Sequence, residues 1–551
     1  MIIVAAVIVV GTLVLMTSGV VSPIIALTSG VILAALLRII TPAQAFSGLS
    51  NAGIITVGAM LVIAKGIVQT GIVSRATRRL LLTVTSAGQA LRRLAVPVGV
   101  ASGLMNTTPI VAMLIPASKQ LEQTRNIPAR EVMLPIAHLT TLAGSITLIG
   151  TSSNLLIAGI AGTKGVDMSL LSFAPVALPV AVVGALVLYF TAPRILRGQG
   201  TTEESVLNWR VELPLSGRAI SIGRMPHKLG LKKTRDYELE SIKRDGEYLA
   251  PDAELRAGDL LVFYATEAGI KSLWVNPLFG LEPHRLYSVS VNTGEHGTLN
   301  DFEDLGAIRV IAAQTTVSLR RTPLTAGATC YVTAEDVQSI QDSEFIALWQ
   351  DAASRAPQPG KTWLALAILV AVIGAASFGL APVELTSVAG ALLMVLTGVL
   401  TPRSAARALD WNVLFILAGS VSLGAVVIES GLADQLAKLI RFIAAGNELG
   451  IVLVLAVVTA LLTNLVTNAA AASILTPVAI VLAIEIGLDP VTMLALIGTC
   501  ISFTFVNPFS HQTNLMVIGP IGYSKAQFVR FGAPLLVVCL AAACGMALVL
   551  A

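Results

Sequence analysis

Four hydrogen-bonding side chains interrupt the apolar stretch LLTNLVTNAAAASILTP at residues 461–477. They are Thr463, Asn464, Thr467 and Asn468. An amide or hydroxyl buried in hydrocarbon without a partner costs roughly a few kcal/mol, so these groups need something to bind. Side-chain and backbone oxygens of this kind suit a hard cation, and free backbone N–H groups suit an anion. Asn and Thr also bond one membrane helix to another, which is the simpler interpretation for any single residue.

Three further polar segments lie in apolar surroundings. LMNTTPIVAMLIP surrounds Asn106, GSITLIGTSSN ends at Asn154, and SFTFVNPFSHQTN ends at Asn514. Polar residues near the middle of 87–120 and 448–485 predict re-entrant hairpins, whereas Gly, Ser and Pro in the other two segments predict unwound turns inside helices. Such broken backbone is tolerated only where it is packed in protein or lines a cavity.

The composition defines the elements that must position these groups. The 551 residues are 55% hydrophobic and only 12% charged, which predicts a polytopic membrane protein. The net charge of +4 is too small to indicate a nucleic-acid partner, and the spacing of the four cysteines indicates neither a disulfide nor a zinc site. Stretches long enough to span a bilayer are 2–17, 20–40, 52–72, 172–190, 362–380, 383–400, 412–430 and 532–550.

Between residues 201 and 360 the sequence becomes charged and turn-rich, with short β-type runs such as LLVFYA. We expect a soluble α/β domain inserted between two membrane blocks, 1–200 and 361–551. Its length allows two small domains, 201–280 and 281–360.

The two membrane blocks resemble each other at a nearly constant offset. Gly71 and Gly431 are 360 positions apart, and the segments starting at Thr41 and Thr401 have the same offset. The segments around Asn106 and Asn468, and those ending at Asn154 and Asn514, also align. Duplicated halves are common in transporters. We predict an α-helical fold built from an inverted repeat, with five spans and one re-entrant hairpin in each half.

Basic residues indicate the orientation. If residues 201–360 are cytoplasmic, Arg75, Arg78, Arg79, Arg92, Arg93 and most other basic residues of the membrane blocks also lie inside. We therefore expect a multi-pass protein of the cell or inner membrane, with both termini extracellular or periplasmic.

These residues resemble the divalent anion:sodium symporter (DASS) family, which includes sodium-coupled sulfate and dicarboxylate carriers. The hairpin tips of that family carry Ser-Asn-Thr signatures, and Met105-Asn106-Thr107 and Thr467-Asn468-Ala469 occupy those places. Its unwound turns appear as the segments ending at Asn154 and Asn514. The resemblance covers both membrane blocks, but Met105 and Ala469 each remove a hydroxyl from the signature.

The resemblance implies a homodimer that moves its substrate by elevator-like alternating access, with sodium ions bound between each hairpin tip and the facing unwound turn. The implied sodium ligands are Ser102, Asn106, Gly144, Ser145, Asn154, Asn464, Asn468, Thr504 and Asn514. The implied anion-binding residues are Asn106, Thr107, Thr108, Ser152, Ser153, Thr467, Asn468, His511, Gln512 and Thr513.

The insert resembles the C-terminal RCK (TrkA-C) domain over residues 211–266, with Arg244-Asp245-Gly246 and Arg256-Ala257-Gly258-Asp259 as its turns. Residues 281–350 resemble a degenerate second copy. This resemblance implies a regulatory domain that binds a small ligand such as a nucleotide. Carriers with such inserts are often assigned to sulfate, which favours that substrate.

Several alternatives stay open. Lys65 is either a functional cation within a span or a snorkelling lysine, and His511 is either a substrate ligand, a proton-coupling group or a structural histidine. The substrate is sulfate, a di- or tricarboxylate, or another oxyanion. An RCK-gated channel or potassium-uptake subunit is a different class, but a TVGYG-like filter is absent from the sequence. An enzyme is not expected, because HExxH and phosphate-loop motifs are absent too.

Overall fold

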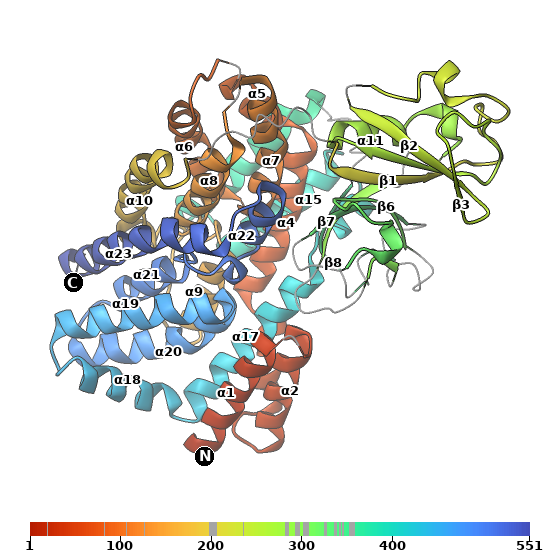
Figure 1. Ribbon diagram of the computed structural model, residues 1–551. Coiled ribbons are helices and arrows are strands. Elements are labelled where there is room, and N and C mark those ends of the chain that lie inside the picture. The colour runs from red at the N-terminus through yellow and green to blue at the C-terminus, as the bar shows by residue number, and fades with distance from the viewer. Residues whose placement is uncertain are drawn as a thin grey trace. The chain divides into compact units, whose positions relative to one another are not determined.

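Two compact units make up the chain, Met1–Gly200 with Pro357–Ala551, and Thr201–Ala356 (Figure 1). The first is helical and the second contains a β-sheet, so the helical class and the inserted domain are confirmed. The computed structural model describes residues 1–18, 20–81, 83–105, 107–125, 127–197, 207–234, 236–281, 286–291, 298–300, 308–323, 328–334, 339–340, 343, 346–351 and 359–550.

The described helices of the first block follow one another with short connections. They are α1 (Ile2–Ser18), α2 (Pro23–Leu36), α3 (Pro42–Ala45), η1 (Ser47–Ser50), α4 (Ala52–Gln69), α5 (Ile72–Leu81), α6 (Ala87–Leu104), α7 (Thr107–Arg125), α8 (Ala129–Gly144), α9 (Ser152–Gly162) and α10 (Ala174–Ile195).

The second block has nearly the same order of elements. It comprises α14 (Thr362–Ser377), α15 (Val383–Leu396), α16 (Pro402–Ala406), α17 (Trp411–Glu429), α18 (Leu432–Ile443), α19 (Glu448–Leu465), α20 (Asn468–Ile486), α21 (Pro490–Ile501), η6 (Pro508–Ser510), α22 (Gln512–Ile521) and α23 (Lys525–Leu550). Long α4 thus corresponds to α17, amphipathic α5 to α18, and the pair α6–α7 to α19–α20. The inverted orientation of the halves stays a prediction.

Local sequence signals explain why the two blocks begin their helices at matching places. Thr41 and Thr401 each cap a short helix that starts with proline, and each threonine hydroxyl accepts a hydrogen bond from a backbone N–H three residues later. Gly71 and Gly431 both adopt positive φ, 70° and 74°, at the sharp turn before the amphipathic helix.

Close helix packing joins the two blocks. Helix α4 packs on α15, α2 on α17, and α10 on α23. Glycines allow this approach: a Cβ added at Gly66 would lie 2.8 Å from Met394 Sδ, and one at Gly184 would lie 3.2 Å from Cys539 Sγ. One hydrophobic core therefore includes residues from both blocks.

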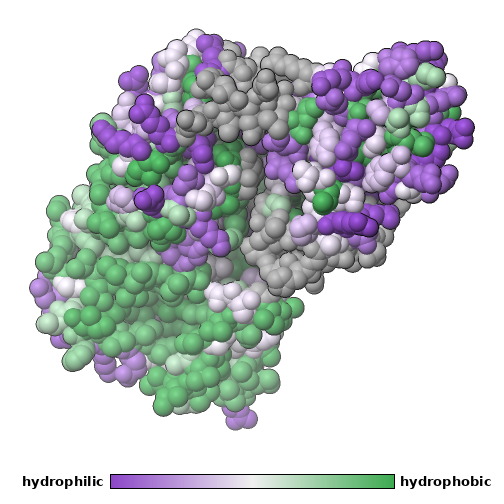
Figure 2. Space-filling view, in the orientation of Figure 1, coloured by the Kyte–Doolittle hydropathy of each residue, from purple (hydrophilic) through white to green (hydrophobic). Residues whose placement is uncertain are grey.

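Six of the described helices are long and apolar enough to cross a membrane by length and composition, namely α4, α10, α17, α19, α20 and α23. Figure 2 shows hydrophobic side chains over much of the visible surface of the helical unit, while the inserted unit presents mainly hydrophilic ones. Both features are typical of a multi-pass membrane protein with a water-facing insert.

The described residues of the insert form an eight-stranded sheet of antiparallel pairs in the order β3-β2-β4-β1-β6-β7-β5-β8. The strands are β1 (Trp209–Pro214), β2 (Tyr237–Arg244), β3 (Glu247–Leu249), β4 (Leu260–Ala265), β5 (Leu286–Val291), β6 (Ile308–Ala313), β7 (Thr329–Ala334) and β8 (Ile346–Asp351), and α11 (Glu267–Trp274) follows β4. Two hydrophobic cores lie in this unit, and pairing of β1 with β6 makes the sheet continuous. The division at residue 280 and the RCK assignment stay predictions.

An ion pair joins the two turns that carry the RCK-like signature. Arg244 Nε and Nη2 donate to Asp259 Oδ1 and Oδ2 at 2.7 and 2.8 Å. Burial acts to raise the pKa of the Asp259 carboxyl, but the hydrogen bonds from Arg244 and from the backbone N–H of Arg256 outweigh it and hold that pKa below its usual range. The carboxylate therefore remains charged at neutral pH and fixes the loop before β4.

We predict that Gly48→Ala destabilises the helical unit. A Cβ at Gly48 would lie 2.1 Å from the backbone oxygen of Ala418 in α17, so the backbone must shift, at a cost of about 1–3 kcal/mol. Gly11→Ala in α1 is the matched control, because nothing lies within 4 Å of its added Cβ. Thermal unfolding in detergent should show a lower melting temperature for the first variant alone; equal melting temperatures would contradict the packing described.

Candidate functional site

The first polar tip faces the break between α8 and α9. Helix α6 ends at Leu104 and α7 begins at Thr107, and residues 145–151 separate α8 from α9. Ser102 Oγ donates to the carbonyl oxygen of Thr140 at 2.6 Å, and Thr147 Oγ1 donates to that of Gly103. The hairpin and the broken helix are therefore held together by side-chain hydrogen bonds.

Carbonyl oxygens converge where this tip meets the break. A Cβ added at Gly150 would lie 2.3 Å from the carbonyl oxygen of Gly144 and 2.9 Å from that of Ser102. A Cβ at Gly144 would lie 3.2 Å from the carbonyl oxygen of Gly150 and 3.5 Å from Ser102 Oγ. The two glycines let these backbone segments approach closely and so bring four oxygen atoms together, which is a suitable setting for a hard cation.

The second tip is built in the same way. Residues 502–511 separate α21 from α22, and the chain reverses at Val466 and Thr467 between α19 and α20. Thr463 Oγ1 lies 2.7 Å from the carbonyl oxygen of Ile501 and 2.9 Å from Asn468 Oδ1. The hydroxyl of Thr463 thus connects the break to the tip.

Asn464 and Asn507 complete this second contact. Asn464 Nδ2 donates to the carbonyl oxygens of Ala460 and Phe503, both at 2.8 Å. Asn507 Nδ2 donates to the carbonyl oxygen of Asn464 at 2.7 Å, and the backbone N–H of Asn507 donates to Asn464 Oδ1 at 3.3 Å. Asn464 therefore satisfies a carbonyl of the break, and Asn507 satisfies a carbonyl in the last turn of α19.

One hydrogen bond recurs in both halves. Ser102 bonds the carbonyl 38 positions later, and Thr463 does the same. Asn154 Nδ2 likewise donates to the carbonyl oxygens of Ser145 and Thr147, and Asn514 Nδ2 donates to that of Thr504. The two halves use equivalent side chains for equivalent backbone atoms.

Three buried oxygens at the two breaks have no hydrogen-bond partner in the described part of the chain: Asn154 Oδ1, Asn514 Oδ1 and Thr504 Oγ1. A buried oxygen without a partner costs about 1–3 kcal/mol, so their repeated occurrence calls for a ligand. They are neutral oxygen donors, the kind that a sodium ion accepts, and the residues present fit such an ion.

The helix ends at the breaks give the site its electrostatic character. Helices α7, α9, α20 and α22 begin at the tips and breaks, whereas α6, α8, α19 and α21 end there. Beginning helices present N–H groups to an anion, and ending helices present carbonyls to a cation. Segments 102–108, 145–154, 463–468 and 502–514 contain no Asp, Glu, Lys or Arg.

Packing across the halves brings these elements together. Helix α9 packs on α20, and α22 packs on α7. Thr108 Oγ1 of the first hairpin donates to Gln512 Oε1 at the start of α22, at 3.4 Å. The first tip therefore lies beside the second break.

Burial separates the two predicted sets of residues. The described sodium-ligand candidates are all buried except Asn468, namely Ser102, Gly144, Ser145, Asn154, Asn464, Thr504 and Asn514. Most of the described anion-binding candidates retain exposed surface, namely Thr108, Ser152, Thr467, Asn468, His511 and Gln512, whereas Thr107, Ser153 and Thr513 are buried. Asn106 lies outside the described residues.

His511 lies at the second break, whereas Lys65 lies outside the tips and breaks. His511 caps α22, and its Nδ1 accepts a hydrogen bond from the backbone N–H of Thr513 at 3.2 Å. That bond makes Nδ1 an acceptor and leaves Nε2 to carry the ring proton when the imidazole is neutral. Lys65 lies on α4 with an exposed side chain, apart from the tips and breaks described above.

The sequence alone did not identify two residues that lie at or near the site. Asn507 bonds the second tip, although the adjacent Pro508 marked the turn. His138 in α8 is fully buried against Phe505, Phe528 and Phe531, with ring centroids 5.1–5.8 Å away. An ionisable residue within an apolar span was the available signal.

We predict that Thr504→Val weakens sodium binding without harming the fold. The hydroxyl has no described protein partner, so replacing it by a methyl group should leave the sodium-free protein equally or more stable. Thr499→Val is the control, because Thr499 Oγ1 donates to the carbonyl oxygen of Ala495 within its own helix.

The measurement is the rise in melting temperature when choline chloride is replaced by sodium chloride. The rise should shrink in Thr504→Val and persist in Thr499→Val. An unchanged rise in Thr504→Val would remove Thr504 from the site.

Comparison with known proteins finds relatives among membrane transporters. Over 564 residues the chain is 28% identical to an uncharacterized transporter of Synechocystis, with 93% of this chain and 91% of that protein covered. It is 26% identical to a putative sulfur deprivation response regulator of Chlamydomonas reinhardtii, with 94% and 97% covered. It is 30% identical to sodium/sulfate cotransporter 2 of the same alga, with 41% and 26% covered.

The family described as "Citrate transporter" matches residues 12–483, which include the first half, the insert and both arms of the second hairpin. The predicted kinship to sodium-coupled anion carriers is thereby confirmed at the level of the family. The chain belongs to the citrate transporter family, a family of membrane transporters.

Proposed function

We propose that the protein is a sodium-coupled symporter of a divalent inorganic anion, with sulfate as the preferred substrate. The observation that carries this proposal is the pair of buried asparagine oxygens, Asn154 Oδ1 and Asn514 Oδ1, left without a protein partner at equivalent breaks in the two halves. Each lies at a break whose helix ends supply carbonyls, so each half offers one sodium site.

The helix N-termini of the site favour an anion. Four helices, α7, α9, α20 and α22, begin at the tips and breaks, and a helix N-terminus is equivalent to roughly half a positive elementary charge. Four other helices, α6, α8, α19 and α21, end at the same places with the opposite partial charge, so the N-termini offer sulfate local N–H donors without a net positive charge. The bound sodium ions add to this attraction.

The names of relatives point the same way. Sodium/sulfate cotransporter 2 is matched over 41% of this chain, and a relative matched over nearly the whole chain is named for sulfur deprivation. The exposed polar residues, including Asn468 and Gln512, would contact the anion, and the buried ones the sodium ions.

A citrate or dicarboxylate carrier is the second candidate, favoured by the description of the family. Met105 and Ala469 each remove a hydroxyl from the tip signature of the family that the membrane blocks resemble. A compact dianion such as sulfate can be held by fewer side chains than a longer carboxylate, so these two losses favour sulfate.

The remaining parts of the proposal concern assembly. The carrier works as a homodimer by elevator-type movement, and the insert is a cytoplasmic regulatory domain that binds a small ligand such as a nucleotide. The continuous sheet of the insert, joined through β1 and β6, supports a single regulatory unit.

Uptake into proteoliposomes tests substrate and coupling. Labelled sulfate should accumulate only with an inward sodium gradient, and excess citrate or succinate should compete weakly. Strong competition by citrate would favour the carboxylate carrier. Uptake that depends on pH and does not depend on sodium would instead indicate proton coupling through His511.

We predict that Gly150→Ala reduces sodium-driven uptake by at least about tenfold, because displacing binding groups by 1 Å costs that much or more. Its Cβ would collide with the carbonyl oxygens of Gly144 and Ser102, where the cation is expected. Gly162→Ala, at the end of α9 and with nothing within 4 Å of its added Cβ, should transport normally. Normal uptake by Gly150→Ala would place the sodium ion elsewhere.

A further inference from the structure

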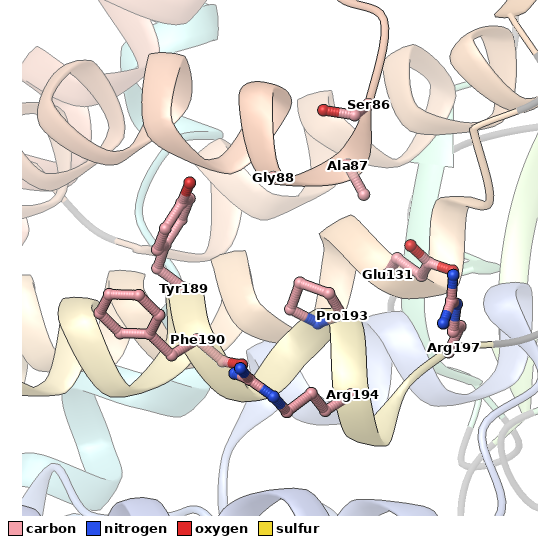
Figure 3. A pocket seen from close by; sticks show the side chains of 9 residues that line it. All are labelled: Ser86, Ala87, Gly88, Glu131, Tyr189, Phe190, Pro193, Arg194 and Arg197. Atoms are coloured by element: carbon pink, nitrogen blue, oxygen red, sulfur yellow. The ribbon is translucent and has the colours of Figure 1, made fainter.

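A pocket opens at the N-terminal ends of α6 and α8, whose C-terminal ends form the first tip and the first break. It has a volume of about 590 Å³ and lies between the start of α6, the first part of α8 and the end of α10 (Figure 3). Its chemistry comes from Arg194, Arg197, Glu131, Tyr189 and Phe190. The transport site described above uses none of these residues.

The charged groups of the pocket favour an anion. Two arginines and one glutamate leave one net positive charge, and Figure 3 shows the Glu131 carboxylate beside the Arg197 guanidinium. Arg194 Nη1 donates to the carbonyl oxygen of Phe190 at 2.6 Å, which holds the guanidinium at the pocket wall. An arginine has five N–H donors, so this bond leaves others for a phosphate.

The apolar groups favour a ligand with a hydrocarbon part. Leu178, Val182, Leu186 and Phe190 recur every four residues along α10, and each is 50–55% exposed. Residues at this spacing form one stripe along a helix. The stripe runs from Leu178, near the start of α10, to the pocket and ends at Phe190, one turn before Arg194.

We propose that this pocket binds the phosphodiester headgroup of an anionic phospholipid, whose acyl chains lie along the α10 stripe. A headgroup with a single negative charge matches the net charge of the pocket, and an arginine-lined pocket between helices at a membrane surface is a recognised setting for such lipids. The volume is suited to a headgroup but not to a whole lipid.

The position of the pocket gives the lipid a structural role. Helix α6 runs from the pocket at Ser86 and Ala87 to the tip after Leu104, and α8 runs from Glu131 to the break after Gly144. A lipid bound there would contact the far ends of the two helices that carry the first half of the transport site. The proposal concerns binding of lipid and does not depend on the identity of the transported anion.

The test uses the full-length protein in neutral detergent. Binding of phosphatidylglycerol and phosphatidylcholine is measured by native mass spectrometry and by the shift in melting temperature. Glycerol phosphate and inorganic phosphate serve as probes without acyl chains. We expect phosphatidylglycerol to bind more tightly than phosphatidylcholine, and the two chain-free probes to give no shift.

The double variant Arg194→Gln and Arg197→Gln should lose affinity for phosphatidylglycerol by at least about tenfold, because each basic residue near a lipid surface contributes about fivefold. The matched control, Arg79→Gln with Arg92→Gln, removes two exposed arginines outside the pocket and should bind as the wild type does. Arg194→Lys with Arg197→Lys keeps the charge and should retain most of the binding, which separates lost binding from lost folding.

Phe190→Ser tests the proposed contact between the acyl chains and the α10 stripe. It should weaken phosphatidylglycerol binding while the protein remains folded. Equal affinity of wild type and the Arg194→Gln, Arg197→Gln variant would overturn the proposal. A stability shift caused by inorganic phosphate, abolished in the same variant, would also overturn it, since the pocket would then bind a soluble anion.

Discussion

Breaks in helices inside an apolar protein impose the constraint on which this structure depends. Each break frees N–H and carbonyl groups that would have been paired in a continuous helix, and these groups cannot turn to lipid. Asn154 and Asn514 solve part of this problem by donating their amide N–H groups to the freed carbonyls of their own breaks. Asn464 and Asn507 do the same between the second break and its hairpin.

The same asparagines therefore explain two roles that looked like alternatives. Their amide nitrogens donate hydrogen bonds that hold backbone segments together. The amide oxygens of Asn154 and Asn514 are buried without a partner among the described residues. An amide has a donor end and an acceptor end that face opposite ways. One end can stabilise the broken backbone while the other remains for an ion.

Packing between the halves then determines which breaks and tips can act together. Each hairpin bonds the break of its own half, but α9 lies on α20 and α22 lies on α7, so each second arm supports the other half's broken helix. Each tip is therefore packed by elements of both halves. The pocket at the far ends of α6 and α8 adds a place where the surrounding lipid can act on the same helices.

The sequence by itself determined the helical membrane class, the inserted domain and the positions of the tips and breaks, because apolar length, Gly and Pro punctuation and the 360-residue offset are local or periodic signals. It could not determine which oxygens stay unpaired, since Asn154 and Thr504 gain or lack partners only through neighbours brought close by folding. The role of Asn507, the burial of His138 among three phenylalanines and the pairing of β1 with β6 were likewise decided by tertiary structure. Each depends on contacts between segments distant in sequence, for which a single chain carries no local signal.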